Sequence, residues 1–136
     1  MTHKILVVDD DADSRRILRI VLGSVADILE AADGEEALRK IKSKKPNLVL
    51  LDIAMPKMGG LDVLESALKL APGLIVVMLT GQSDIGVAKA ALDKGARAYI
   101  TKPVDPQRLR EEVEDLLGLN APADDPLRRK PWRVVG

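Results

Sequence analysis

Polar side chains of three kinds follow apolar stretches of this sequence, and together they suit the chemistry of phosphate and a divalent metal. Carboxylate and hydroxyl oxygens without His or Cys favour a hard cation such as Mg²⁺ or Mn²⁺. A close group of carboxylates also needs positive charge, because like charges in a partly buried site cannot all stay ionised. The residues, with the stretches they end or follow, are Asp9 and Asp10 after "KILVV", Asp52 in "NLVLLD", Thr80 in "LIVVMLT" and Lys102 after "RAYIT".

An aspartate in such surroundings has the chemistry of a phosphoryl acceptor. Aspartyl phosphate is a known covalent intermediate in proteins. Lys102 and a metal would neutralise charge on the transferred group, and the Thr80 hydroxyl would donate to one of its oxygens. Asp52 is the candidate acceptor, because a lone carboxylate after the apolar "LVLL" costs stability and has few structural uses.

The apolar stretches alternate with helical patterns, which predicts how these residues come together. Alternation of this kind indicates a parallel sheet with helices on both faces. We therefore expect an α/β fold of three layers, α/β/α, with a doubly wound five-stranded parallel sheet. Ligands of such sheets bind at the carboxyl ends of the strands. The predicted strands are 4–8, 26–31, 47–52, 74–80 and 97–101, and the predicted helices are 11–24, 33–44, 60–70, 83–96 and 105–119.

Several of these residues also fit purely structural roles. Asp11 is expected to cap the first helix, and Asp9 and Asp10 taken alone fit a helix start equally well, because acids favour helix N-termini. Thr80 alone fits the end of a strand. Tyr99 is by default a packing residue. Only the match of these positions with Asp52 and Lys102 at neighbouring strand ends favours a metal site.

The composition sets further limits. The chain has 136 residues, 21 basic and 21 acidic side chains, and no Cys, which excludes disulfides and thiolate metal sites. We expect one domain over 1–119 and a Pro-rich basic tail or linker over 120–136. Residues 1–119 lack the basic surface and the aromatic side chains of a nucleic-acid binder. No apolar run is long enough to span a membrane, so the expected location is the cytoplasm.

Four stretches in order resemble the response-regulator receiver domain of two-component signalling, in particular its chemotaxis-regulator-like members. They are "ILVVDDD", "LVLLDIAMPKMGGLDVL", "VVMLTG" and "KGARAYITKP". The resemblance covers about residues 3–119. It implies the flavodoxin-like strand order 2-1-3-4-5 and a phosphoryl group received by Asp52 from the phosphohistidine of a sensor histidine kinase or phosphotransfer protein.

The resemblance also implies a metal site and a phosphoryl site. Asp10 and Asp52 would bind Mg²⁺ directly, together with the main-chain carbonyl of Ala54. Asp9 would hold the metal largely through water. Lys102 would pair with the phosphoryl group. The phosphoryl oxygens would accept hydrogen bonds from the main-chain N–H groups of Ile53 and Gly81.

Switching is the output that the resemblance implies. Thr80 would move to donate to the phosphoryl group, and Tyr99 would turn inward with it. The rearranged surface, formed by the fourth helix, fifth strand and fifth helix, would then bind a partner or an output domain. Family members vary at Ala54 and Gln82, and side chains at these positions are thought to tune the lifetime of the phosphoryl group.

Two other functions compete with this interpretation. A pseudo-receiver would keep the fold as a protein-binding module without phosphoryl chemistry, but the complete acidic cluster and Lys102 speak against it. A Mg²⁺-dependent phosphohydrolase usually carries a second acid two residues after its nucleophile, where this chain has Ala54. The sequence leaves open the cognate kinase, the pathway, a homodimer, and whether the chain is complete or cut from a longer protein.

Overall fold

The computed structural model describes residues 3–55, 58–119 and 133–135, with Gln82 and 133–135 described by their backbone alone. Strands and helices alternate as expected. The strands are β1 (Lys4–Val8), β2 (Asp27–Ala31), β3 (Leu48–Asp52), β4 (Ile75–Thr80), β5 (Ala98–Thr101) and β6 (Arg133–Val135). The helices are α1 (Ala12–Leu22), α2 (Gly34–Lys44), α3 (Gly60–Leu70), the short 3₁₀ turn η1 (Gln82–Asp84), α4 (Ile85–Asp93) and α5 (Pro106–Leu116).

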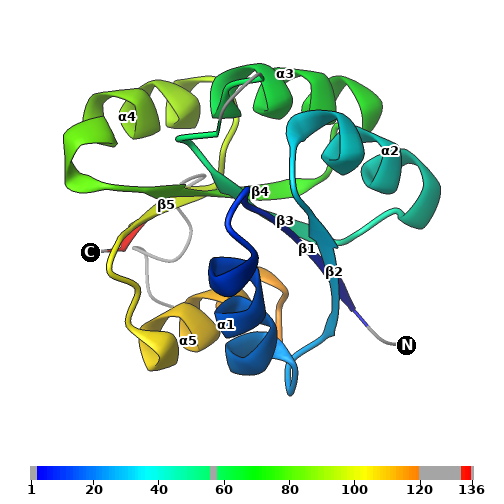
Figure 1. Ribbon diagram of the computed structural model, residues 1–136, viewed down its shortest axis with the longest axis vertical. Helices are drawn as coiled ribbons and strands as arrows, with labels where there is room; N and C mark the ends of the chain where they lie inside the picture. The colour runs from blue at the N-terminus through cyan, green and yellow to red at the C-terminus, as the bar shows by residue number, and fades with distance from the viewer. Residues whose placement is uncertain (1–2, 56–57, 120–132, 136) are drawn as a thin grey trace.

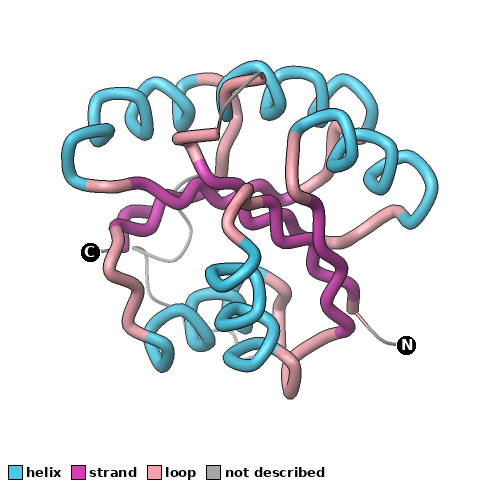
Figure 2. The backbone as a smooth tube through the Cα atoms, viewed as in Figure 1, coloured by secondary structure: helices cyan, strands magenta, loops and turns pink. Residues whose placement is uncertain are grey.

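One sheet divides the molecule into three layers (Figure 1). Its strands stand in the order β2-β1-β3-β4-β5-β6, and every neighbouring pair is parallel. Helices α2, α3 and α4 cover one face, and α1 and α5 cover the other (Figure 2). The predicted order 2-1-3-4-5 is confirmed. The order reverses between β1 and β3, which is where ligands of such sheets bind.

Two apolar cores explain why the central strands are apolar throughout. Side chains alternate between the faces of a strand, so strands covered by helices on both faces need apolar residues at every position. Leu51 and Met78 are fully buried toward α2, α3 and α4, whereas Leu50 and Val77 are fully buried toward α1 and α5. Each such side chain contributes about 1.5–3 kcal/mol of burial energy.

Acidic side chains cap three helices, among them α1, where the sequence predicts Asp11 as the cap. The Asp11 carboxylate accepts a hydrogen bond of 3.0 Å from the N–H of Asp13 at the start of α1. Asp33 and Asp105 cap α2 and α5 in the same way. A cap of this kind is worth about 1 kcal/mol. Each cap fixes the residue at which its helix begins, and so limits the movement of the loop between the preceding strand and that helix.

The structure differs from the prediction at two places. The helix predicted over 83–96 begins as the 3₁₀ turn η1 and ends at Asp93. A sixth strand, β6, lies within the stretch predicted as a tail or linker and pairs with β5. The rest of that stretch, 120–132 and 136, lies outside the described residues. In the part of the chain that is described, no helix is both long and apolar enough to cross a membrane.

Candidate functional site

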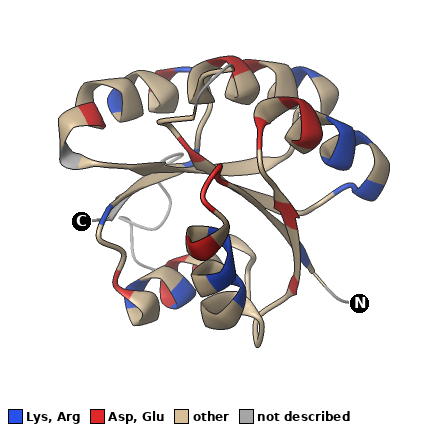
Figure 3. Cartoon of the chain, in the orientation of Figure 1, with Lys and Arg blue, Asp and Glu red and all other residues tan. Residues whose placement is uncertain are grey.

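The predicted site residues meet at one edge of the sheet. Asp52 and Thr80 are the last residues of β3 and β4, and Asp9 directly follows β1. Parallel pairing in register brings these strand ends side by side. Lys102 follows β5, whose Thr101 pairs with Thr80. Figure 3 shows acidic positions gathered where β1 and β3 end.

Three carboxylates form the centre of this site. Asp9, Asp10 and Asp52 each offer an oxygen atom, and these atoms lie within 4.8 Å of one another. Asp9 and Asp52 are buried, with 1% and 6% of their surface exposed, whereas Asp10 is exposed. Oxygen ligands at this spacing, partly buried and partly open to solvent, are the donor set that a hard divalent cation prefers.

Among the described residues, the Asp9 carboxylate has a hydrogen-bond donor for only one of its two oxygens. Its Oδ1 accepts a hydrogen bond of 2.9 Å from the N–H of Asp11, but its buried Oδ2 has no hydrogen-bond partner among the described residues. Burial raises the pKa of the Asp9 carboxyl group, and the neighbouring Asp52 charge raises it further. A buried carboxylate oxygen without a donor costs free energy. The site therefore fits a metal ion, which would remove that cost.

Lys102 supplies the one ammonium group found near the described carboxylates of this site. Its Nζ lies 3.5 Å from Asp52 Oδ2 and 3.7 Å from Asp9 Oδ2. The Lys102 main-chain N–H donates to the Thr80 carbonyl at 2.7 Å, and the peptide bond to Pro103 is cis. The end of β5 thus places the Lys102 ammonium group beside two of the acids.

Two main-chain N–H groups beside the acceptor have different partners. The Ala54 N–H donates to Asp52 Oδ1 at 3.1 Å. The Ile53 N–H donates to the Leu79 carbonyl at 3.0 Å and so belongs to the sheet. In this arrangement the Ala54 N–H reaches the acceptor carboxylate, whereas the Ile53 N–H is used by the sheet.

The predicted switch residues are both buried. The Thr80 hydroxyl donates a hydrogen bond of 2.9 Å to the Gly81 carbonyl, so in this structure it does not donate to a carboxylate. Tyr99 packs in the core beneath α4, where Ala88 and Ala91 also lie. Ala54 is exposed next to the acceptor. The side chain of Gln82, the second predicted tuning position, lies outside the described residues.

The sequence analysis did not identify the ion pair of Arg15 and Glu30, which holds the main chain of the acidic cluster. The Arg15 guanidinium donates to the Asp9 carbonyl oxygen at 2.6 Å and to Glu30 Oε1 at 3.1 Å. Arg19 holds the other oxygen of Glu30 at 2.7 Å. The hydrogen bond from Arg19 lowers the pKa of Glu30, so this carboxylate stays charged. The feature of the sequence that could have indicated this pair is Glu30, an acid inside the mostly apolar stretch "ADILEA".

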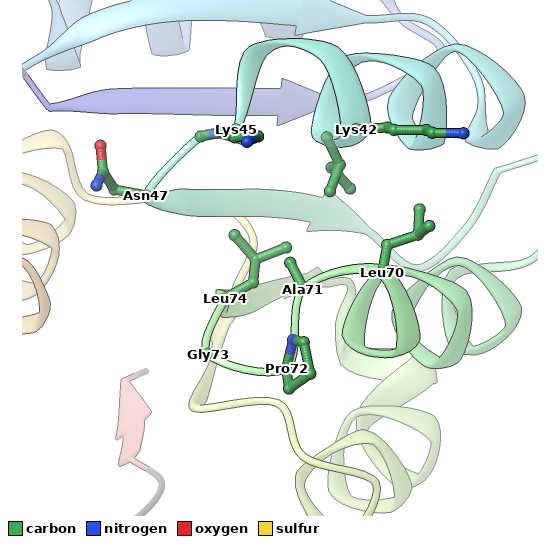
Figure 4. A pocket seen from close by; sticks show the side chains of 10 residues that line it. Lys42, Lys45, Asn47, Leu70, Ala71, Pro72, Gly73 and Leu74 are labelled. Carbon is green, nitrogen blue, oxygen red and sulfur yellow. The ribbon is translucent and has the colours of Figure 1, made fainter.

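Two pockets differ in their chemistry. A cavity of about 240 Å³ opens beside the acids and is bordered by Ile17, Lys102 and Val104. A cavity of about 550 Å³ lies at the opposite edge, before β3 and β4 begin, and has Lys42 and Leu70 among its residues (Figure 4). That second cavity has no carboxylate or hydroxyl side chain in its lining. Of these two pockets, only the first is bordered by a carboxylate and by Lys102.

The comparison with known proteins agrees with this fold. The family model of the response regulator receiver domain matches residues 5–114. This chain belongs to that family. Among solved structures, a CheY-like response regulator receiver domain protein from Methanospirillum hungatei JF-1 is similar, with a TM-score of 0.82, 37% identity and coverage of 88% of this chain and 96% of that one. The receiver domain of NtrX from Brucella abortus gives a TM-score of 0.80 at 35% identity, with 85% and 99% coverage.

Curated relatives are longer proteins. A probable transcriptional regulator, ycf27, from Porphyridium aerugineum is 43% identical over 116 residues, which are 85% of this chain and 48% of the relative. The DNA-binding response regulator MtrA from Mycolicibacterium paratuberculosis is 40% identical over 121 residues, covering 88% of this chain and 53% of the relative. The chain thus spans about half the length of these relatives, as the receiver domain of a response regulator.

Proposed function

We propose that this receiver domain is a phosphorylatable switch with Asp52 as its acceptor. An Asp52 carboxylate oxygen attacks the phosphorus of a phosphohistidine on a sensor kinase or phosphotransfer protein. The new P–O bond forms as the P–N bond breaks, and the electron pair of that bond returns to the imidazole, which takes up a proton. The observation that supports this most strongly is Lys102 Nζ, 3.5 Å from Asp52 within the carboxylate cluster.

Each residue of the site has its own proposed role in phosphoryl transfer. Lys102 offsets negative charge on the transferred group, and the N–H of Ala54 orients the acceptor carboxylate. Asp9, Asp10, Asp52 and the Ala54 carbonyl are the proposed ligands of Mg²⁺ or Mn²⁺. When bound, the cation neutralises charge on the phosphoryl oxygens as the group is transferred. The main-chain N–H groups of Ile53 and Gly81 remain the proposed donors to those oxygens.

The proposed output is a change on the surface of α4, β5 and α5. A phosphoryl group at Asp52 gives the Thr80 hydroxyl a charged acceptor in place of the Gly81 carbonyl. Movement of Thr80 would change the packing of Tyr99, which lies on the neighbouring strand. This is a local charge event that biases a two-state element. The relatives named as transcriptional regulators suggest an output domain or a separate partner protein as the receiver of this signal.

The phosphodonor would dock beside α1. Ile17 and Ile20 lie on this helix with 58% and 73% of their surface exposed, and Ile17 borders the 240 Å³ cavity at Lys102. Exposed apolar side chains at the rim of a polar site are typical of a protein interface. A protein that carries a phosphohistidine on an apolar surface fits this position.

The test is intact mass after incubation with Mg²⁺ and acetyl phosphate as a small phosphodonor. We expect the gain of one phosphoryl group that requires Mg²⁺, is lost in Asp52→Asn and is kept in Asp62→Asn, an exposed aspartate of α3. No gain in a folded protein that also fails to bind Mg²⁺ would favour the pseudo-receiver instead. A gain that survives in Asp52→Asn would disprove the assignment of the acceptor.

A further inference from the structure

A cavity of about 550 Å³ lies at the edge of the sheet where β3 and β4 begin, away from the acidic cluster (Figure 4). Its volume falls within the range of about 300–1,000 Å³ that is typical of small-molecule sites. The end of α2 and the loop to β3 form one wall, and the end of α3 and the loop to β4 form the other. The proposed phosphoryl transfer at Asp52 uses none of these residues, so the cavity is independent of that function.

The wall from α3 is apolar. It consists of Leu70, Ala71, Pro72, Gly73 and Leu74, and Figure 4 shows the side chains of Leu70 and Leu74 directed toward the facing wall. Leu70 has 49% of its surface exposed. An exposed apolar side chain beside a cavity gains free energy when a ligand removes it from water. This wall therefore suits the apolar body of a ligand.

The wall from α2 carries the polar groups of the cavity, which are Lys42, Lys45 and Asn47. Within the described residues, neither lysine has a carboxylate at ion-pair distance. The Oδ1 atom of Asn47 accepts a hydrogen bond of 2.8 Å from the Lys4 N–H, so the N–H groups of its amide are the donors left for a ligand. Two ammonium groups and an amide donor, with no acid in the lining, favour an anion.

The conformation of Lys45 strengthens this interpretation. Lysines near the end of a helix are favourable in any case, because the C-terminus carries partial negative charge. Lys45, however, is the C-cap of α2 with a φ of 50°, a left-handed position where Gly is the usual residue and a Cβ costs free energy. Among the described residues it is the one non-glycine with positive φ. A strained residue whose charged side chain borders a cavity indicates a role for that side chain.

We propose that this cavity binds a small apolar carboxylic acid in its ionised form. The carboxylate accepts hydrogen bonds from the ammonium groups of Lys42 and Lys45 and from the amide of Asn47. The apolar body packs against Leu70 and Leu74. A lysine ammonium group sits on a flexible stem and so adjusts to the position of the bound carboxylate.

The test is a titration of the whole chain with octanoate, followed by NMR of the amide groups. Acetate offers the carboxylate without the apolar body, and octanol offers the body without the charge. We expect octanoate to shift the amides of Asn47 and Leu74, with a dissociation constant on the order of a millimolar for so small a ligand. Acetate and octanol should each bind about tenfold more weakly.

Three results of this titration would overturn the proposal. The first is the absence of saturable shifts with octanoate. The second is equal binding of octanol, because the lysines would then recognise nothing. The third is a set of largest shifts at the exposed Ile17 and Ile20 of α1, because octanoate would then bind any exposed apolar surface.

Lys45→Gly separates recognition from folding. Glycine relieves the left-handed cap, so the free energy of unfolding in urea should rise. The affinity for octanoate should nevertheless fall about tenfold, because one charged donor is lost. The matched control is Lys44→Gln, which removes a neighbouring exposed charge that does not border the cavity. Unchanged affinity in Lys45→Gly would overturn the proposal, and so would an equal fall in Lys44→Gln, since that would mean general attraction to a basic surface.

Leu70→Ser tests the apolar wall. Because Leu70 is half exposed, the change should leave the fold intact but weaken octanoate binding about fivefold. Leu119→Ser is the matched control, since Leu119 has 45% of its surface exposed and lies outside the cavity lining. Equal affinities of the two variants would overturn the assignment of the apolar wall. Shifts of the Asn47 and Leu74 amides on dilution of ligand-free protein would also overturn the proposal, because a second copy of the chain would then cover the cavity.

Discussion

The Arg15 guanidinium donates a hydrogen bond of 2.6 Å to the main-chain carbonyl of Asp9, the first acid of the carboxylate cluster. Glu30 on β2 accepts from the same guanidinium, so the loop between β1 and α1 is tied to the neighbouring strand. The Asp9 N–H makes a second tie, at 3.1 Å to the Ala31 carbonyl. The backbone that presents Asp9 and Asp10 is therefore held by groups that do not themselves touch a metal.

Arg15→Gln should weaken Mg²⁺ binding about tenfold, because groups that orient metal ligands typically contribute tenfold or more to affinity. Titration calorimetry on folded protein measures the effect. The control is Arg16→Gln, since Arg16 is exposed and pairs only with exposed Asp13 among the described residues. Wild-type affinity in Arg15→Gln would show that the loop keeps its position without the guanidinium.

Mg²⁺ should raise the melting temperature of the wild-type protein, because a ligand that binds the folded state stabilises it, by about 2.7 kcal/mol at a hundred times its dissociation constant. Asp10→Asn should reduce this gain, since Asp10 contributes an oxygen to the cluster but is exposed. Thermal unfolding at constant ionic strength measures the shift. Asp13→Asn serves as the matched surface control, and an equal gain in all three proteins would argue against a site at the cluster.

Gly60→Ala should destabilise the fold by about 1–3 kcal/mol, the usual cost of overpacking. A Cβ at Gly60 would lie 2.9 Å from the Cα of Ile53 and 3.2 Å from the carbonyl oxygen of Asp52, and neither main-chain atom can move without shifting the acceptor. The neighbouring Gly59 has open space, so Gly59→Ala should stay within about 0.5 kcal/mol of wild type. Urea unfolding compares the two. Equal free energies of unfolding for the two variants would mean that α3 can move away from Asp52 without cost.

Glu30 should make stability depend on pH in the acid range. Its pKa is lowered from the usual 4.5, first by the hydrogen bond from Arg19 and also by Arg15, so the folded state binds fewer protons than the unfolded state. The stabilisation is present above pH 4.5 and is lost as pH falls through the lower pKa of the folded protein.

Glu30→Gln should therefore flatten the loss of stability below pH 4.5, by less than about 1 kcal/mol because the pair is partly exposed. Denaturant unfolding at a series of pH values measures this, with Glu35→Gln on the exposed start of α2 as the control. A curve for Glu30→Gln that is parallel to wild type would contradict the prediction.

Much of this protein follows from local patterns in its sequence. Apolar strands such as "LVLLD" are recognisable because burial on both faces requires apolar side chains at every position. The caps at Asp11, Asp33 and Asp105 act within a few residues of chain and so are equally readable. Because parallel strands end at one edge, the convergence of Asp9, Asp52, Thr80 and Lys102 also follows from the order of the elements.

Contacts between distant segments were decided only by the tertiary structure. Arg15 reaches Glu30 because β1 and β2 are neighbours in the sheet, and no local sequence pattern predicts that these two strands pair. The Ile53 N–H is taken by Leu79 because β3 continues its ladder with β4 for one more residue. The pairing of Arg133–Val135 with β5 has the same origin, since three residues carry too little pattern to identify a strand, and only a free edge of the assembled sheet gives them a partner.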